Sequence, residues 1–210
     1  MGERTSLEIF EDVGAILTNT HVVYTSGRHG STYVNKDALY PHTSETAELC
    51  GRIAAHFADL QPEVVAGPTI GGVLLAQWIA HQSPPLPDGR RALAVFAEEH
   101  DGARVFRRGY ADLIPGKRVL VVEDILTTGG SARKVVDAVR ALGGEVIGLG
   151  ALCNRGGVQA ADLGAPELFA LLTLELESWD AAACPLCRQG IPLNTRVGKA
   201  GLATKVDPRP

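Results

Sequence analysis

VLVVEDILTTGGS, residues 119–131, is the stretch of this chain that decides its fold. Its four leading apolar residues predict a buried strand, and the polar residues that follow lead into a helix predicted over 131–142. Gly143 and Gly144 end that helix, as glycine commonly does at a helix C-terminus. The stretch therefore predicts a strand, a polar turn and a helix in direct succession.

The polar turn contains the residue types that bind a phosphate monoester. Adjacent glycines allow a tight turn with exposed backbone N–H groups, hydroxyl side chains add donors, and the start of a helix favours negative charge. The candidate residues for a ribose 5-phosphate are Thr127, Thr128, Gly129, Gly130 and Ser131.

Glu123 and Asp124 precede this turn, where they can accept hydrogen bonds from the vicinal hydroxyls of a ribose joined to the phosphate. A plain strand end followed by an N-cap would account for Asp124 and Ser131 alone, but two acids at the end of a buried strand need a further reason. The chain has no G-x-x-x-x-G-K-[ST] motif, and Gly148-Leu149-Gly150 lacks the third glycine of a dinucleotide loop because residue 153 is Cys. A nucleoside triphosphate or a dinucleotide is therefore disfavoured.

The rest of the chain alternates between short apolar stretches and amphipathic ones. This rhythm predicts an α/β fold with a mainly parallel central sheet flanked by helices, which binds ligands at the carboxyl ends of its strands. Two β-prone stretches near the N-terminus predict a hairpin. The expected helices cover 6–17 (with Ser6 as N-cap), 43–59, 72–81 and 131–142, and the expected strands cover 22–24, 32–34, 63–66, 92–96, 117–122, 145–152 and 169–176.

Length and composition are ordinary for one soluble globular domain, with 210 residues, 45% hydrophobic and 21% charged. A net charge of -4 gives no reason to expect a nucleic-acid partner. No apolar run approaches the roughly 20 residues of a membrane span, and the acidic N-terminal segment is unlike a secretory signal. We therefore expect a cytoplasmic protein with no membrane partner, and its sparse cysteines are expected to be reduced.

The stretch 119–131 resembles the signature of the phosphoribosyltransferase family, a strand followed by two acids and a Thr/Gly-rich phosphate loop. The order of elements from about residue 6 to residue 197 is similar to that of the orotate phosphoribosyltransferases. The resemblance implies a type I phosphoribosyltransferase fold with residues 1–198 as a single domain. Its small N-terminal hood would come mainly from about 18–40 together with 177–198, and 199–210 would form a flexible tail.

Further segments resemble the substrate sites of the orotate enzymes. SGR at 26–28 followed by STY at 31–33 is similar to the hairpin that covers the base, and GPTIGG at 67–72 is similar to the loop that receives the pyrophosphate. Arg155 falls where the family places an arginine that pairs with the orotate carboxylate, a pairing that suits a planar guanidinium. The implied residues are Arg155, Thr127, Tyr33 and Ser26 for orotate, and Thr69, Ile70, Gly71 and Arg104 for pyrophosphate. Arg155 can also be read as a solvated loop charge, and Tyr33, like His29, as an ordinary hairpin residue.

The chain departs from many orotate enzymes at three places. Thr25 stands where they have a lysine, Ile70-Gly71 where they have Tyr-Lys, and the mobile loop AEEHDGARVFRRGY at 97–110 is shorter. That loop and the CPLC at 184–187 resemble a bacterial subgroup with a similar Arg-Arg-Gly-aromatic stretch and a terminal Cys-Pro-Leu-Cys. The catalytic residues implied are Glu123, Asp124 and the loop cations Arg107 and Arg108.

The implied reaction transfers the phosphoribosyl group of 5-phosphoribosyl 1-pyrophosphate to orotate, giving orotidine 5'-monophosphate and pyrophosphate in pyrimidine biosynthesis. Mg²⁺ would bind through the substrate, without an assigned protein ligand, because a hard cation prefers oxygen ligands and keeps several waters. A homodimer is implied because the loop in this family often closes over the neighbouring subunit's site. Two alternatives stay open: transfer to another base such as a purine, which would have no use for Arg155, and a non-catalytic sensor, for which no helix-turn-helix segment is appended.

Cys184 and Cys187 form a Cys-x-x-Cys pair that is either a packing feature or half of a zinc site. One pair supplies two of the four ligands that a structural zinc normally needs, so a complete site would require other ligands or a partner subunit. The pair also lacks the strand-to-helix setting of a thioredoxin motif.

Overall fold

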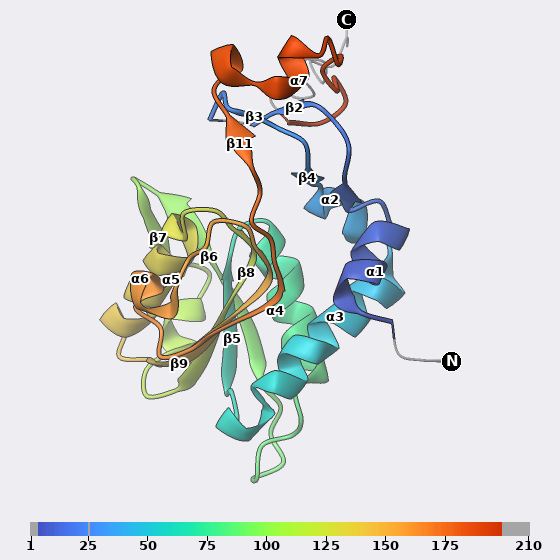
Figure 1. Cartoon of the computed structure of the whole chain (residues 1–210). Helices are drawn as coiled ribbons and strands as arrows, with labels where there is room; N and C mark the ends of the chain where they lie inside the picture. Colours follow the sequence, from blue (N-terminus) through green and yellow to red (C-terminus); the bar gives the residue numbers. More distant parts are fainter. Residues whose placement is uncertain (1–3, 25, 199–210) are drawn as a thin grey trace, which may run out of the picture. The chain divides into compact units, whose positions relative to one another are not determined.

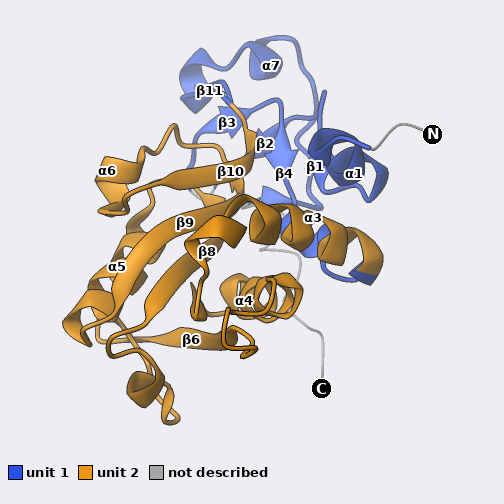
Figure 2. Cartoon of the chain, turned by 90° about the horizontal axis from the view of Figure 1, so that it is seen from below, with its two compact units in different colours: residues 1–43, 175–210 blue, residues 44–174 orange. Residues whose placement is uncertain are grey.

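The computed structural model describes residues 4–24 and 26–198, which divide into two compact units (Figure 2). Unit 1 combines residues 1–43 with 175–210, and unit 2 consists of residues 44–174. Thr25 and the tail expected over 199–210 lie outside the described residues. Within the described parts of the chain, every helix falls short of the length and apolar character that crossing a bilayer requires.

Unit 2 is built around a six-stranded sheet (Figure 1), in the strand order β10-β9-β8-β5-β6-β7. Neighbouring strands are parallel throughout, except that β7 runs antiparallel to β6. The mainly parallel sheet that the sequence predicts is therefore confirmed. Its strands are β5 (Val64–Pro68), β6 (Leu93–His100), β7 (Ala103–Val105), β8 (Arg118–Leu126), β9 (Glu145–Asn154) and β10 (Leu168–Thr173).

Helices cover both faces of this sheet (Figure 1). On one face, Gly148 of β9 leaves room for Phe57, which directly follows α3 (Thr43–His56). A Cβ atom at Gly148 would lie 2.5 Å from the Phe57 ring. On the other face, Leu149 of β9 joins a buried cluster with the valines of α5 (Gly130–Ala141). The remaining helices of unit 2 are α4 (Gly71–Gln82), α6 (Ala160–Leu163) and the 3-10 turns Ala58–Leu60 and Tyr110–Leu113.

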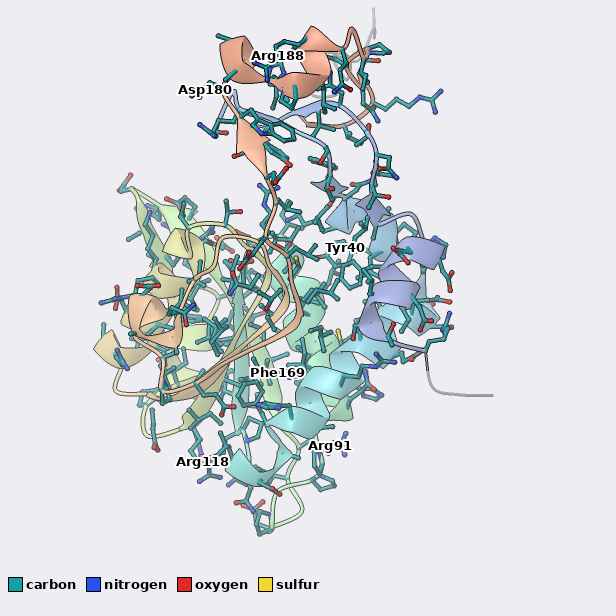
Figure 3. All side chains as sticks on the ribbon, viewed as in Figure 1. Tyr40, Arg91, Arg118, Phe169, Asp180 and Arg188 are labelled. Carbon is teal, nitrogen blue, oxygen red and sulfur yellow. The ribbon has the colours of Figure 1, made fainter. Side chains whose placement is uncertain are left out.

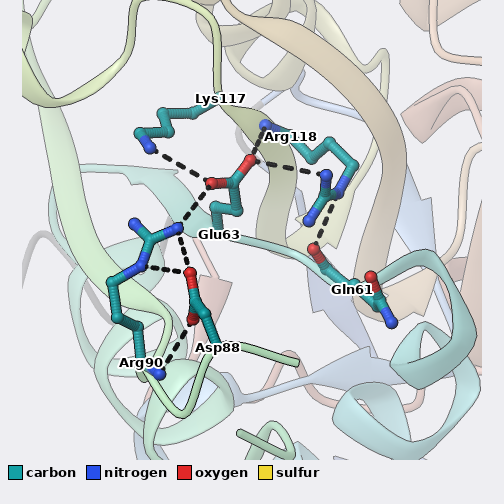
Figure 4. A network of polar contacts seen from close by, with 6 residues as sticks. All are labelled: Gln61, Glu63, Asp88, Arg90, Lys117 and Arg118. Carbon is teal, nitrogen blue, oxygen red and sulfur yellow. Dashed lines mark hydrogen bonds and ion pairs between the residues drawn. The ribbon is translucent and has the colours of Figure 1, made fainter. Parts of the chain in front are cut away.

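A cluster of ion pairs closes the amino edge of the sheet (Figure 4). Glu63 accepts a hydrogen bond from the Lys117 ammonium at 3.1 Å and one from the Arg118 backbone N–H at 3.2 Å, and the Arg90 guanidinium lies 3.7 Å from it. Burial raises the pKa of this carboxyl, but the hydrogen bonds and positive charges outweigh burial and the pKa is lowered. Since Glu63 directly precedes β5, the cluster stabilises the end of the sheet opposite the strand carboxyl ends.

Unit 1 is assembled from short elements of both chain ends. In its three-stranded sheet, β3 lies between β2 and β11, both antiparallel to it. Arg28 fastens this pairing, because its guanidinium donates to the Ser178 hydroxyl at 2.9 Å and to Asp180, labelled in Figure 3, at 2.9 Å. The elements are α1 (Ser6–Asp12), β1 (Ile16–Leu17), β2 (Val22–Val23), β3 (His29–Gly30), β4 (Tyr33–Val34), α2 (Lys36–Leu39), β11 (Ser178–Trp179), the 3-10 turn Ala181–Ala183 and α7 (Pro185–Arg188).

Three local predictions for unit 1 are wrong. The helix expected over 6–17 ends at Asp12, because Gly14 adopts a φ of +69° and the chain continues as β1; its N-cap is Thr5, which forms a capping box with Glu8. The stretch 32–34 contains β4, which pairs with β1, whereas the stretch 22–24 pairs with β3. The wrong helix end and the wrong strand partner both involve the pairing of β1 with β4, which local sequence does not encode.

Candidate active site

The strand order places a topological switch point between β5 and β8. Along the chain, β5 continues through α4 to its neighbour β6, whereas β8 on its other side continues to β9 and β10 in the opposite direction. In open parallel sheets, the crevice at the carboxyl ends of two such strands is the usual ligand site. The loops predicted to bind phosphate and pyrophosphate follow these two strands.

The loop 127–131 follows β8 and leads into the N-terminus of α5, as the sequence predicts. Gly129 is the helix N-cap with a φ of +74°, and a Cβ atom there would lie 2.5 Å from Leu163 and 3.0 Å from Val158. Only glycine satisfies both the backbone angle and the lack of space. The Gly130 N–H is directed toward the Thr128 hydroxyl at 3.4 Å, so the loop keeps the compact turn that a phosphate cradle needs.

Glu123 and Asp124 lie in the last part of β8 and are 7% and 4% exposed. Each carboxylate accepts a local backbone hydrogen bond: Glu123 from the Asp124 N–H at 3.1 Å, and Asp124 from the Ile125 N–H at 2.7 Å. Two acids are therefore held in defined positions, and two residues separate them from the loop 127–131. A buried carboxylate needs compensating donors, and bound hydroxyl groups would supply more of them.

The second glycine loop follows β5 and includes Thr69, Ile70 and Gly71, with the peptide between Thr69 and Ile70 in the cis form. Gly67 and Gly72 bring the two sides of the loop into backbone contact, since a Cβ atom at Gly67 would lie 2.5 Å from the Gly72 carbonyl oxygen. Ile70 is 83% exposed at the start of α4. Two neighbouring loops thus each begin a helix of 12 residues, an arrangement suited to two anionic groups.

Arg104 of β7 connects these two loops. Its guanidinium donates to the Thr69 hydroxyl at 3.1 Å and to the Ser131 hydroxyl at 3.0 Å, while Glu99 lies 3.5 Å from it. The side chain is 12% exposed, and its buried Nε has no hydrogen-bond partner among the described residues. A largely buried cation therefore lies between the candidate phosphate and pyrophosphate loops.

Arg107 and Arg108 follow β7 and are both exposed. Arg108 has a φ of +60°, donates to the Glu98 carboxylate at 2.7 Å and lies 6.0 Å from the centre of the Phe96 ring. Arg107 makes no ion pair with any residue that the structure describes. Part of the expected loop 97–110 forms the β6–β7 hairpin, and the two arginines lie in the segment after it.

Arg155 follows β9, and its Nε donates to the Thr127 hydroxyl at 3.3 Å, so two residues predicted to bind the base lie together. Sequence reasoning missed the two neighbours that shape this loop. Asn154 is buried and exchanges hydrogen bonds with the backbone of Val158, at 2.8 and 3.1 Å. Gly156 packs against the Thr127 carbonyl oxygen with no room for a Cβ atom. The sequence Asn-Arg-Gly-Gly at the end of an apolar strand is the signal from which this tight loop could have been predicted.

Ser26 and Tyr33, also predicted for the base, belong to unit 1, whereas Arg155 and Thr127 belong to unit 2. The Ser26 hydroxyl lies 3.4 Å from the Arg28 N–H, at the turn between β2 and β3, and Tyr33 is half-buried in β4. Their part in binding the base stays a prediction. Cys184 and Cys187 also lie in unit 1.

Comparisons with known proteins agree with this geometry. Residues 36–164 match the family described as phosphoribosyl transferase domain. The orotate phosphoribosyltransferase of Pelotomaculum thermopropionicum is 43% identical over 187 residues, covering 88% of this chain and 91% of that protein. That of Caldicellulosiruptor bescii is 38% identical over 195 residues, covering 92% and 96%. 

Solved structures of Mycobacterium tuberculosis orotate phosphoribosyltransferase are also similar. The complex with Fe(III) dicitrate has a TM-score of 0.63 at 29% identity, covering 80% of this chain and 96% of that one. The complex with 5-phospho-alpha-D-ribosyl 1-diphosphate has a TM-score of 0.58 at 26% identity, covering 83% and 92%.

Proposed function

This chain belongs to the phosphoribosyl transferase family, and we propose from that premise the reaction of an orotate phosphoribosyltransferase. The enzyme transfers the phosphoribosyl group of 5-phosphoribosyl 1-pyrophosphate to N1 of orotate, giving orotidine 5'-monophosphate and pyrophosphate. The reaction is a step of pyrimidine biosynthesis.

The observation that carries the choice of base is the contact between Arg155 and Thr127. It sets a guanidinium beside the loop that we assign to the ribose 5-phosphate, in the same unit of the structure. Orotate bears a carboxylate that a guanidinium can bind through two parallel hydrogen bonds, whereas a neutral purine offers no such group. A positive charge at this position therefore favours orotate over a purine.

We assign the sugar-phosphate contacts to the loops around the switch point. The backbone N–H groups and hydroxyls of 127–131, at the start of α5, bind the 5-phosphate. Glu123 and Asp124 accept hydrogen bonds from the ribose hydroxyls and favour the positive charge that develops on the ribose as pyrophosphate leaves. Orotate ionises without a strong base, so no general base is assigned.

We assign the pyrophosphate to Thr69, Ile70 and Gly71, with Arg104 as the cation that neutralises it. Arg104 already donates to hydroxyls of both anion-binding loops, so an incoming phosphate oxygen would replace a neutral acceptor with a charged one. Arg107 and Arg108 remain proposed catalytic cations; Arg108 would have to release Glu98 before it could reach a leaving group.

The residues at this edge fit Mg²⁺ bound through the substrate. The buried carboxylates of Glu123 and Asp124 add negative charge beside the place proposed for the ribose hydroxyls, and oxygen ligands are those that Mg²⁺ prefers. The ion would neutralise charge on the pyrophosphate. We also propose a homodimer, as the family resemblance implies, and a cytoplasmic location, and both stay predictions of the sequence.

Pyrophosphate release in the presence of different bases tests the proposal. The full-length protein is given 5-phosphoribosyl 1-pyrophosphate and Mg²⁺ with orotate, uracil, adenine or guanine. We expect release with orotate alone. Release with adenine or guanine would establish the purine alternative, and tight binding of the sugar pyrophosphate without release for any base would establish the sensor.

A further inference from the structure

Four side chains of types that can bind a metal converge in unit 1, outside the site described above. They are His21, His29, Cys184 and Cys187, and one ligand atom from each lies within 4.8 Å of the ligand atoms of the other three. His21 and His29 come from the N-terminal part of the chain and the cysteines from the C-terminal part. The sequence drew attention to the cysteine pair alone.

The local structure explains why these four side chains meet. Strand pairing sets Val23 opposite His29, so His21, two residues earlier, lies on the same face of the hairpin and diagonal to His29. On the other side of β3, Trp179 of β11 pairs with His29, which brings the C-terminal segment to this sheet. Cys184 is the N-cap of α7, whose first residue is a proline, and Cys187 is the third residue of that helix.

Three nitrogen–sulfur distances match those of a tetrahedral site with two nitrogen and two sulfur ligands, and the nitrogen–nitrogen distance is shorter than in such a site. With Zn–N bonds of about 2.05 Å and Zn–S bonds of about 2.3 Å, ligand atoms would lie roughly 3.3 Å apart for two nitrogens and roughly 3.5 Å apart for nitrogen and sulfur. The His21 Nε2 atom lies 2.9 Å from His29 Nδ1, 3.5 Å from Cys184 Sγ and 3.6 Å from Cys187 Sγ. His29 Nδ1 lies 3.4 Å from Cys187 Sγ.

The surroundings of His21 fit a metal ligand. Its Nδ1 lies 2.7 Å from the Ile191 carbonyl oxygen, to which it can donate a hydrogen bond. With the proton on Nδ1, the lone pair of Nε2 is directed into the cluster, as commonly found for histidines that bind metals. His21 is 2% exposed, His29 8% and Cys184 0%, while Cys187 is exposed. The site is therefore shielded on most sides, but an ion can enter beside Cys187.

We propose that His21, His29, Cys184 and Cys187 bind one structural Zn²⁺ that joins the two chain ends of unit 1. A tetrahedral set of two sulfurs and two nitrogens is typical of zinc, and four protein ligands leave no open position for catalysis. The sheet of unit 1 gives a reason for such a link, because each of its three strands has only two residues and so forms few backbone hydrogen bonds. Small assemblies with little core commonly need a metal or disulfides for stability.

Two other interpretations account for fewer of the observations. A packing cluster would explain the burial, but it gives no reason for four ligand atoms to be directed at one another instead of at separate partners. A redox disulfide between Cys184 and Cys187 would explain the cysteine spacing, but not the two histidines that approach the same sulfur. The zinc site accounts for all four residues.

Metal analysis of the full-length protein, produced without a histidine tag, is the first test. We expect about one zinc per chain, lost in Cys184→Ser and in His29→Ala. The matched controls Cys50→Ala and His42→Ala change a cysteine and a histidine outside the cluster and should keep the zinc. Wild-type protein that holds no zinc, even after incubation with Zn²⁺, would overturn the proposal, as would full zinc retention in both cluster variants.

Two measurements keep the test decisive if a cluster variant does not fold. Cobalt substituted into the wild-type protein should give the visible absorption of tetrahedral Co²⁺ together with thiolate-to-metal charge transfer, and the absence of both would contradict the site. The chain has two tryptophans, so Trp78→Phe leaves Trp179, paired with His29, as the reporter of unit 1. Removal of zinc with a chelator should change the fluorescence emission of Trp179, and added Zn²⁺ should restore it. Unchanged emission would contradict a structural role for the metal.

Discussion

The two ends of α5 provide a test of why the loop 127–131, which we assign to the ribose 5-phosphate, requires glycine. Gly129 at its N-terminus has a φ of +74° and Gly143 beyond its C-terminus has a φ of +77°. A Cβ atom at Gly143 would meet nothing within 4 Å, whereas one at Gly129 would lie 2.5 Å from Leu163. Substituting alanine at each position therefore separates the cost of the backbone angle from the cost of crowding.

The expected magnitudes follow from these contacts. A left-handed backbone costs an alanine about 1–2 kcal/mol at either position. The Gly129→Ala methyl would also approach the buried Leu163 about 1 Å closer than an ordinary carbon contact of about 3.5–4.0 Å, and such overpacking costs about 1–3 kcal/mol. We expect a loss of about 1–2 kcal/mol for Gly143→Ala and about 2–5 kcal/mol for Gly129→Ala.

Equilibrium urea unfolding followed by circular dichroism measures both losses, and each kcal/mol corresponds to a fall of about 2–4 °C in Tm. Steady-state kinetics adds a functional measurement. Gly129→Ala should raise KM for 5-phosphoribosyl 1-pyrophosphate at least about tenfold, because a displaced donor to a charged phosphate costs about 1.5–3 kcal/mol, while Gly143→Ala should leave it unchanged. Equal losses of stability and equal KM values for the two variants would refute the reasoning.

Three further substitutions test separate parts of the account. Arg155→Ala should raise KM for orotate about 10- to 100-fold, through loss of a charge-assisted hydrogen bond, with KM for the sugar pyrophosphate within about twofold of wild type; an equal rise in both constants would contradict its assignment to the base. Arg104→Gln should lower kcat/KM for the sugar pyrophosphate about 10- to 100-fold, a larger loss than that of Arg107→Gln at an exposed position. A larger loss for Arg107→Gln in the same assay would assign neutralisation of the leaving pyrophosphate to Arg107 instead. Glu63→Gln should lose stability at pH 7: the pKa of this carboxyl is lowered in the folded state, so its contribution is present above the ordinary value of 4.5 and is lost as pH falls through the lower folded value. Urea unfolding at pH 7 and pH 3 should therefore show the gap between wild type and variant closing in acid, and an undiminished gap at pH 3 would show that the carboxyl charge is not its source.

The sequence predicts the turn at 127–131 between β8 and α5 well, because the turn depends on neighbouring residues. Glycine at 129 and 130, hydroxyls beside them and an apolar strand before them determine a turn that needs no distant partner. The central sheet is predictable for a similar reason, since strands buried on both faces are apolar along their length. β5 is apolar at every position, and β9 is apolar between Glu145 and Asn154.

Contacts between distant residues could not be predicted in this way. Arg104 and Ser131, which are joined by a hydrogen bond, lie 27 positions apart in the sequence. The β6–β7 hairpin positions the Arg104 guanidinium, whereas the sequence predicts a loop for this segment. The His21 and Cys184 pair is separated by 163 positions and depends on the register of β11 against β3. The sequence contains a cysteine pair that suggests two metal ligands. The two histidines that lie beside it are identified only by the fold.

The most direct test of the assigned activity is the absorbance of orotate after the purified protein is mixed with 5-phosphoribosyl 1-pyrophosphate and Mg²⁺. We predict that orotate is consumed, that orotidine 5'-monophosphate accumulates in equal amount, and that Asp124→Asn abolishes the change while the variant remains folded. Orotate that stays unconsumed by the wild-type protein, or turnover that survives in Asp124→Asn, would contradict the account.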